Sequence, residues 1–167
     1  MRFINGIILK IFHLYQLLLV KSINTVVPLR AIARNTPFHD IRQLAWKKTG
    51  IIFGDKTYIN HSITILDGND TKLIIGNRVA LSPNITFVLY SSPNDSIMMK
   101  DMIYKRYIKS ADIFIDDDTW IGANVVVQPG IKIGKRCIIG SCSNVTKDIP
   151  DDYLAYGNPA KLIKKLI

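Results

Sequence analysis

Residues 115–150 read IDDDTW IGANVV VQPGIK IGKRCI IGSCSN VTKDIP, which are six consecutive groups of six residues. A branched aliphatic residue opens every group, and glycine follows it in three of the six. A period of six differs from the 3.6 residues per turn of an amphipathic helix and from the alternation of a half-buried strand. It is typical of a solenoid in which each group forms one short strand and one turn. The stretch therefore predicts an all-β solenoid.

Two positions of each group are expected to point into this solenoid. The first position is always aliphatic and would stack on its copies in the turns above and below: Ile115, Ile121, Val127, Ile133, Ile139 and Val145. The fifth position is mostly small or branched, as a second inward position requires: Thr119, Val125, Ile131, Cys137, Ser143 and Ile149. The core is therefore expected to form one continuous stack along the solenoid axis.

The same register continues upstream of these groups, from Phe53 onward. Four extra residues disturb it within residues 67–72, and a longer break at residues 93–112, which we call the excursion, fits no group of six. A long segment that leaves a rigid solenoid is usually functional, so the excursion is expected to be a functional arm or a clasp between subunits. We predict that residues 51–150 form the solenoid.

Residues 1–50 are predicted to form an N-terminal helical segment that opens with an amphipathic helix over residues 1–27. The polar residues of this helix fall in one arc of roughly 160° on a helical wheel. Lys10, His13 and Gln16 interrupt the apolar run, which disfavours a transmembrane helix. A basic polar face suits peripheral contact with an anionic membrane surface. Packing against the solenoid or between subunits is the alternative.

Prolines and chain ends define the remaining helices. Pro28 is expected to break the first helix, and a second short helix is expected over residues 40–48. Residues 151–167 are predicted to form a C-terminal cap, because solenoid ends expose strand edges and apolar side chains that need cover. Within the cap, residues 160–167 are expected to form a capping helix.

The charge and the cysteines limit the partners. A formal net charge of +9 on 167 residues suggests phosphorylated ligands, anionic lipid or nucleic acid. The basic residues are spread over both ends and the excursion and form no recognised nucleic-acid module, so nucleic acid is not expected. The register places Cys137 inside the solenoid and Cys142 on a turn. A disulfide or metal pair is therefore not expected, and the sequence predicts a cytoplasmic protein, peripheral to the inner face of the membrane if its first helix binds lipid.

An ordered series of motifs carries a family resemblance: Trp120-Ile121-Gly122-Ala123-Asn124, Pro129-Gly130, Ile133-Gly134, Val145-Thr146-Lys147-Asp148-Ile149-Pro150 and Gly157-Asn158-Pro159-Ala160-Lys161. With these motifs the chain resembles the hexapeptide-repeat acyltransferases, especially the maltose and galactoside O-acetyltransferases and related polysaccharide-biosynthesis acetyltransferases. The resemblance is closest over the C-terminal third and weaker back to Gly50. It implies a left-handed parallel β-helix and a homotrimer that holds acyl-CoA, most simply acetyl-CoA, between neighbouring solenoids.

The same resemblance implies which residues bind the coenzyme. Those along the pantetheine arm would be Trp120, Gly122 and Ala123, followed further along by Ser141, Thr146 and Lys147, with Lys161 and Lys164 near the nucleotide. Small residues let an extended thiol arm run close to the backbone, and lysines match the charge of the coenzyme phosphates. The structural alternative is that the glycines form solenoid corners and the lysines a solvated face.

The catalytic base is where the sequence departs from the family. The resembling enzymes place a histidine in a Thr-His-Pro or similar stretch before the excursion, and Ser92 occupies that place here. Asn60 matches a family asparagine that contacts the acceptor, and the adjacent His61 is one candidate base. Asp95 is another, because desolvation can raise the pKa of a carboxylate. A third possibility is transfer driven by proximity without a dedicated base.

Two functions remain open at this point. The first is an acyl-CoA-dependent transferase that acetylates a sugar hydroxyl or amine, on a glycan or another small acceptor, during surface polysaccharide assembly. The second is a catalytically inactive trimer that binds CoA, a glycan or a biosynthetic partner, since the family histidine is lost. Metal-dependent hydration chemistry would need three convergent histidines. Because His13 and His39 lie outside the repeat, no metal is expected.

Overall fold

The structure is a computed structural model that describes residues 2–68, 70–92 and 108–167. The chain divides into two compact units, residues 1–51 and residues 52–167, which we call the helical unit and the β-helix unit. Most of the excursion, including the candidate base Asp95, lies outside the described residues.

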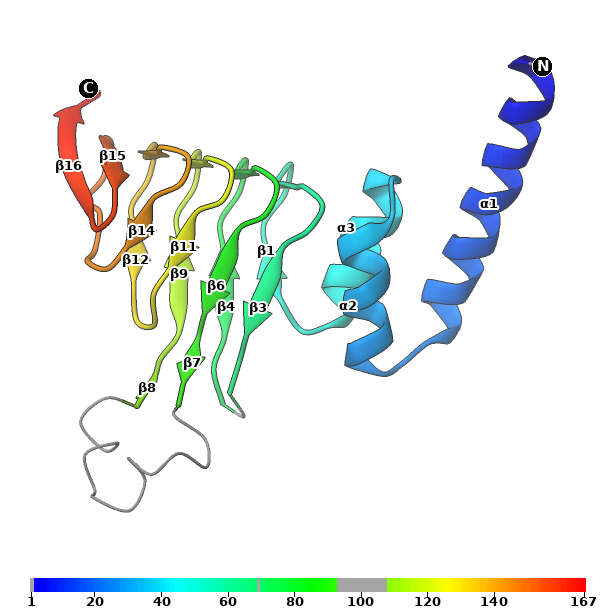
Figure 1. Cartoon of the computed structure of the whole chain (residues 1–167), viewed down its shortest axis with the longest axis horizontal. Helices are drawn as coiled ribbons and strands as arrows, with labels where there is room; N and C mark the ends of the chain where they lie inside the picture. The colour runs from blue at the N-terminus through cyan, green and yellow to red at the C-terminus, as the bar shows by residue number, and fades with distance from the viewer. Residues whose placement is uncertain (1, 69, 93–107) are drawn as a thin grey trace. The chain divides into compact units, whose positions relative to one another are not determined.

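Three helices make up the helical unit (Figure 1): α1 (Arg2–Ser22), α2 (Val26–Asn35) and α3 (His39–Lys48). α2 and α3 pack together and bury a small apolar core: Leu29, Ala33, Ile41, Ala45 and Trp46. The N-terminal helix is confirmed, but the predicted break at Pro28 is wrong. α1 already ends at Ser22, and Pro28 lies in the first turn of α2, where a helix leaves its amide nitrogens unbonded and tolerates proline.

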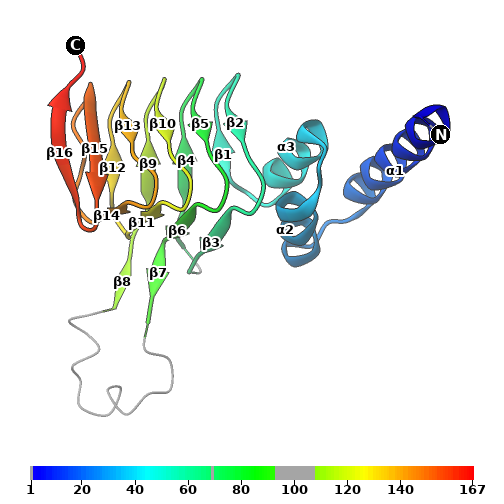
Figure 2. The same ribbon diagram turned by 45° about the horizontal axis from the view of Figure 1, so that its top comes forward.

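The β-helix unit is a coil with three faces, and each face is a sheet that gains one short parallel strand per turn, except that the last strand of the chain pairs antiparallel (Figure 2). Sheet A contains β1 (Ile52–Phe53), β4 (Leu73–Ile75), β9 (Ile113–Ile115) and β12 (Lys132–Ile133). Sheet B contains β2 (Tyr58–Ile59), β5 (Ala80–Leu81), β10 (Trp120–Ile121), β13 (Ile138–Ile139), β15 (Tyr153–Gly157) and β16 (Ala160–Lys165). Sheet C contains β3 (Thr64–Leu66), β6 (Thr86–Val88), β11 (Val126–Val127) and β14 (Asn144–Val145).

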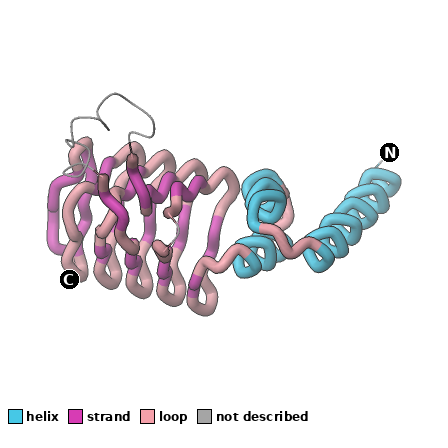
Figure 3. Tube along the Cα trace, turned by 90° about the horizontal axis from the view of Figure 1, so that it is seen from below, coloured by secondary structure: helices cyan, strands magenta, loops and turns pink. Residues whose placement is uncertain are grey.

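Corners connect these sheets in a repeating order, and Figure 3 shows the loops that form them between the short strands. The first corner joins sheet A to sheet B, the second joins B to C, and the third returns from C to A in the next coil. At the third corner an antiparallel ribbon of β7 (Tyr90–Ser91) and β8 (Lys109–Ser110) leaves the coil at the base of the excursion. The coil therefore has two regular corners and one irregular corner.

The core confirms the six-residue register. All six aliphatic first positions of residues 115–150 are at most 2% exposed, and all six fifth positions are at most 6% exposed. Strand pairing stacks equivalent residues directly, so that Ile121 lies between Leu81 and Ile139. Cys137 is buried and Cys142 is exposed on a corner, as predicted. Burial raises the pKa of the Cys137 thiol, which disfavours its reactive thiolate.

The first two corners repeat one backbone conformation. Non-glycine residues with positive φ occur in pairs six residues apart: Lys56 and Ser62, Arg78 and Asn84, Asp118 and Asn124, and Arg136 and Cys142. Asp152 continues the first-corner series in the last coil. This left-handed conformation is uncommon outside glycine, so its repetition marks a turn type imposed by the coil.

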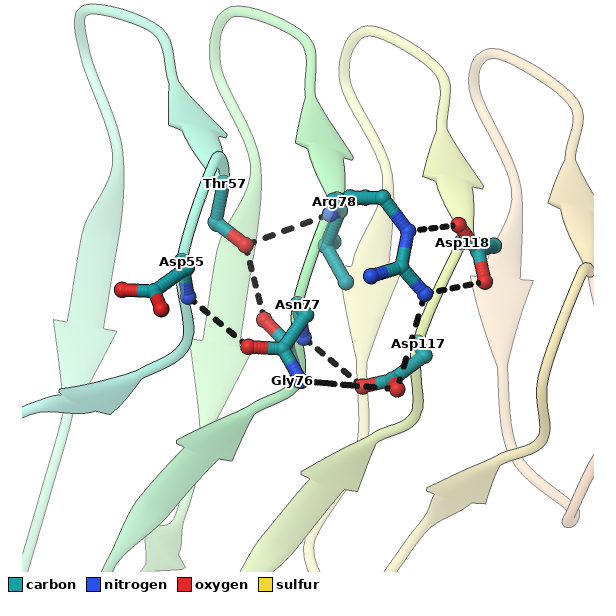
Figure 4. A network of polar contacts seen from close by, with 8 residues as sticks. Asp55, Thr57, Gly76, Asn77, Arg78, Asp117 and Asp118 are labelled. Carbon is teal, nitrogen blue, oxygen red and sulfur yellow. Dashed lines mark hydrogen bonds and ion pairs between the residues drawn. The ribbon is translucent and has the colours of Figure 1, made fainter.

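Side chains connect successive coils at the first corner (Figure 4). The Asn77 carboxamide oxygen accepts from the Asp55 amide at 2.8 Å, and the Asp117 carboxylate accepts from the Asn77 amide at 2.7 Å. The backbone bond from Asn77 is the largest cause that lowers the pKa of Asp117. Each coil therefore satisfies a backbone donor of the coil before it.

Ion pairs reinforce the same corner. The Arg78 guanidinium donates two hydrogen bonds to Asp118 in the next coil, and Arg136 donates two to Asp152. These bonds are the largest causes that lower the pKa values of Asp118 and Asp152. All four side chains are close to solvent, so each pair contributes modestly to stability.

The predicted C-terminal capping helix is wrong. Residues 160–165 form β16, which pairs antiparallel with β15 after the chain turns at Gly157, where φ is +110°. A helix of eight residues is marginal in water, whereas the free edge of β15 offers a row of backbone partners. The hydrogen bonds of that edge therefore override the helical propensity of the segment. The C-terminus covers the end of sheet B as a strand.

Candidate active site

The second corner aligns four residues from successive coils. Asn60, Ser82, Gly122 and Gly140 each follow a strand of sheet B, and their amides donate to the neighbouring strand of the next coil at 2.8–3.1 Å. Parallel strands lie about 4.8 Å apart, so these positions form a row parallel to the coil axis. Asn60 at the start of the row and Ser141 beside its end are thus parts of one strip along the second corner, which we call the second-corner strip.

Trp120 stands beside this strip on the outer face of β10, with 54% of its surface exposed. Its indole Nε1 donates to the Ser82 hydroxyl at 3.3 Å, which fixes the ring toward the preceding coil. Two other candidate residues of this region are small: Ala123, in the same coil as Trp120, is half-buried, and Ser141, in the next coil, is exposed. An aromatic wall beside small side chains suits an extended, partly apolar ligand.

Gly122 has a separate explanation within the fold. A Cβ at this position would lie 2.6 Å from the Ser141 amide nitrogen and 2.9 Å from the Ile139 carbonyl oxygen. Gly122 itself is buried. Its absence of a side chain therefore allows two coils to pack closely.

The third corner holds a hollow of about 430 Å³ where the chain leaves sheet C. Its lining comes from the first two coils and includes the predicted residue Ser92: Ile65, Leu66, Asp67, Val88, Tyr90, Ser91 and Ser92. Asp67 supplies the carboxylate of this lining, and sequence reasoning missed it as a site residue. The available signal was its position in the four-residue insertion, at the same corner as the excursion.

Asn60 and His61 lie away from this hollow in the same chain. The Asn60 side-chain oxygen accepts from the His61 amide at 2.9 Å, and His61 Nδ1 lies 3.0 Å from the Ser62 hydroxyl oxygen. Five residues of mostly extended chain, including β3, separate His61 from Asp67, a distance on the order of 15–20 Å. A single chain does not bring His61 to Ser92, so a site that used both would need corners from two copies.

The predicted lysines lie toward the other end of the coil. Thr146 and Lys147 are exposed at the third corner after β14, and Lys161 and Lys164 are exposed on β16. The helix predicted there would have put Lys161 and Lys164 on one face, because residues three apart share a helix face. Side chains of a strand alternate between two faces, so β16 does not group the two lysines in this way. Within residues 2–68, 70–92 and 108–167, no cluster of three or more His, Cys, Asp or Glu side chains could hold a metal ion.

Sequence comparison connects this arrangement to known proteins. Residues 112–147 match the family described as bacterial transferase hexapeptide (six repeats). A galactoside O-acetyltransferase of Lactococcus lactis is 36% identical over 114 residues, which cover 68% of this chain and 52% of that protein. A galactoside O-acetyltransferase of Escherichia coli is 32% identical over 137 residues, which cover 77% of this chain and 64% of that protein. The chain thus spans half to two thirds of the length of these relatives.

Solved structures agree in fold. A hexapeptide-repeat acetyltransferase from Vibrio cholerae, complexed with acetyl coenzyme A, superposes with a TM-score of 0.67 at 26% identity and 85% coverage of both chains. A maltose O-acetyltransferase from Clostridium difficile gives 0.59 at 28% identity, covering 90% of this chain and 89% of that one. The chain belongs to the hexapeptide-repeat acetyltransferase family. The left-handed β-helix implied by the resemblance is thereby confirmed.

Proposed function

We propose that this protein transfers an acetyl group from acetyl-CoA to a hydroxyl or amine of a sugar. The proposal is supported by the galactoside and maltose O-acetyltransferases that the chain resembles, and by the related Vibrio cholerae acetyltransferase that is complexed with acetyl coenzyme A. The role that we propose for the reaction, modification of a glycan during surface polysaccharide assembly, goes beyond what these relatives report.

One observation carries the proposal: the order of the candidate residues along the coil axis. The hollow with Asp67 and Ser92 belongs to the first two coils, Trp120 and Ala123 to the third. The fourth coil carries Ser141, Thr146 and Lys147, and the last carries Lys161 and Lys164. This order matches one extended ligand parallel to the axis, with its reacting thioester near the hollow and its phosphates near the lysines.

We propose that the active unit is a homotrimer in which the second-corner strip of one copy faces the third-corner hollow of the next. This arrangement is supported by the separation of the two features within one chain. It would bring Asn60 and His61 of one copy toward Asp67 and Ser92 of its neighbour, and the coenzyme would lie between them.

In the proposed reaction, the acceptor oxygen or nitrogen forms a bond to the acetyl carbonyl carbon, the carbon–sulfur bond breaks, and CoA leaves as the thiol. The acceptor proton must leave during the attack. Ser92 cannot take it as an imidazole would, and among the residues that line the hollow Asp67 carries the carboxylate that can. We therefore propose that Asp67, ahead of His61 and Asp95, takes the acceptor proton and passes it to the departing CoA thiolate.

The test is acetyl transfer by the purified full-length chain from acetyl-CoA to a panel of galactosides, maltose and oligosaccharides, read by mass spectrometry of the acceptor and by thiol release. The Cys142→Ser background removes the exposed thiol that would react with the detection reagent, and Ser62 already occupies the equivalent corner position at φ 59°. Acetylated acceptor is the expected product. Tight CoA binding without acetylated product from any acceptor would overturn the transferase and favour the inactive, ligand-binding trimer.

A further inference from the structure

The helical unit uses the polar side of α1 for its own packing. His13 Nε2 lies 2.8 Å from the Asp40 carboxylate on α3, and the Thr36 hydroxyl donates to the Gln16 side-chain oxygen at 2.6 Å. The bond with His13 lowers the pKa of Asp40 against the opposing effect of burial. The polar face predicted to meet solvent or headgroups is thus turned inward.

Lys48 completes this attachment at the end of α1. Its ammonium group donates to the carbonyl oxygens of Val20, Lys21 and Ile23 at 2.7–3.0 Å. These carbonyls are at the C-terminal end of the helix, where unpaired acceptors and the helix dipole favour a cation. α1 is therefore held at several points along its polar side.

The opposite side of α1 is apolar and open. Seven large apolar side chains on it are between 45% and 64% exposed: Ile7, Ile8, Ile11, Phe12, Leu14, Tyr15 and Leu18. At 100° per residue, the side chains from Leu14 through Ile11 to Phe12 span roughly 160° of the helix surface. A helix on the surface of a soluble domain normally shows the reverse orientation, so this face fits a partner that is itself apolar.

Charge indicates what that partner is. Residues 1–51 contain eight Lys and Arg and one acidic residue, Asp40, which gives a net charge of +7 out of the total of +9. Residues 52–167 contain fourteen basic and twelve acidic residues, a net charge of only +2. The apolar face of α1 therefore belongs to the strongly basic part of the chain, and α1 itself contains no acidic residue.

A second copy of α1 fits this surface poorly. A helical seam between copies would be a narrower stripe with charges of both signs along its edges. Here the apolar arc is wide, and pairing would bring together units of net charge +7, which repel one another. No helix in the described part of the chain is long and apolar enough to cross a membrane.

We propose that the helical unit docks on an anionic lipid surface, with α1 lying in the plane of the interface and its apolar face among the upper acyl chains. In-plane helices of this kind combine an apolar face with basic residues at the headgroup level. Lys10 lies at the edge of the apolar arc and, with Gly6, Leu9, His13 and Phe38, lines a hollow of about 460 Å³. That hollow places an ammonium group where a lipid phosphate would lie. The proposal does not depend on the transferase reaction.

Vesicle flotation of the full-length chain tests this docking. We expect co-flotation with vesicles of phosphatidylcholine and phosphatidylglycerol, weaker recovery with phosphatidylcholine alone, and loss of the difference at high salt. The Ile11→Glu/Leu18→Glu variant should bind the anionic vesicles about 100-fold more weakly or worse, because two buried apolar side chains are replaced by anions. Both positions are well exposed, so the fold should be unaffected.

The matched control is Ile52→Glu/Ile167→Glu, which makes the same chemical change at exposed positions of the β-helix unit and should float like the wild type. Wild-type protein that stays unbound, or equal flotation of the α1 variant, would overturn the proposal. So would an α1 variant that lowers the oligomeric mass without lipid while the wild type fails to float, since the face would then join copies. Transfer to a water-soluble acceptor should be unchanged in the α1 variant, which separates this proposal from the proposed reaction.

Discussion

The first and third corners of the β-helix unit both connect neighbouring sheets but are built in opposite ways. At the first corner, every coil uses the same turn with a positive-φ residue: Lys56, Arg78, Asp118, Arg136 and Asp152. Two of these side chains, Arg78 and Arg136, also reach the next coil. At the third corner, the connections differ from coil to coil, and the hollow and the β7–β8 ribbon occur there. Regularity at one corner supports the fold, which leaves the other corner free to vary with function.

The sharpest test of this contrast is removal of one carboxylate from each corner. Asp67→Asn at the third corner should lower kcat/KM for acetyl transfer by about 100- to 1,000-fold, because the proposed proton acceptor is lost. Asp117→Asn at the first corner should leave activity unchanged, since the amide oxygen can still accept from the Asn77 amide. Steady-state kinetics of both variants measures this. Equal activity of the Asp67 variant and the wild type would remove Asp67 from the mechanism.

Replacing Ser92 by the histidine of the resembling enzymes tests the same corner by adding a catalytic group instead of removing one. If the hollow binds the acceptor, Ser92→His should raise kcat by about 10- to 100-fold, with a new dependence on a group of pKa near 6.5. The pH profile of kcat distinguishes an acting imidazole from a mere change in packing. A variant with unchanged kcat and no new titration would indicate that reacting atoms do not pass near position 92.

Activity is expected to depend on the third corner, whereas the stability of the fold should depend more on the first corner. A Cβ at Gly134 would lie 2.3 Å from the Asp151 carboxylate oxygen and 2.7 Å from its backbone nitrogen, so Gly134→Ala should lower the free energy of unfolding by about 2–3 kcal/mol. The matched third-corner change, Gly68→Ala, places a Cβ 3.3 Å from the Tyr90 side chain, which can shift. It should cost less than about 1 kcal/mol. Urea unfolding measures both, and equal losses would contradict the contrast between the corners.

The smallest effect is expected from acid. The hydrogen bonds from Arg136 and Arg78 hold the pKa values of Asp152 and Asp118 below the ordinary value near 3.9. The folded chain therefore binds fewer protons than the unfolded chain. This contribution is present above about pH 4 and is lost as the pH falls through the folded pKa values. The Asp118→Asn/Asp152→Asn variant should show a shallower fall of the urea midpoint below pH 4, and an unchanged fall would assign it to other carboxylates.

The sequence predicts the regular corners and the core because each coil repeats the residue pattern of the coil before it. The inward positions of residues 115–150 follow from the six-residue period alone, and all are buried. The hollow could not be predicted in this way, since Asp67 and Ser92 come to line one hollow through the pairing of β3 with β6 at an irregular corner. Local propensity also failed at residues 160–167, where the open edge of β15 decided the structure.

β16 also has a consequence for the colloidal behaviour of the chain. It closes one side of β15, and its own outer side becomes the last edge of sheet B. An exposed strand edge is a template for edge-to-edge association and fibre growth. β16 carries Lys161, Lys164 and Lys165 within six residues, and all three are exposed. Another strand approaching this edge would meet like charges, so these lysines protect the open end of the coil against stacking onto a second molecule.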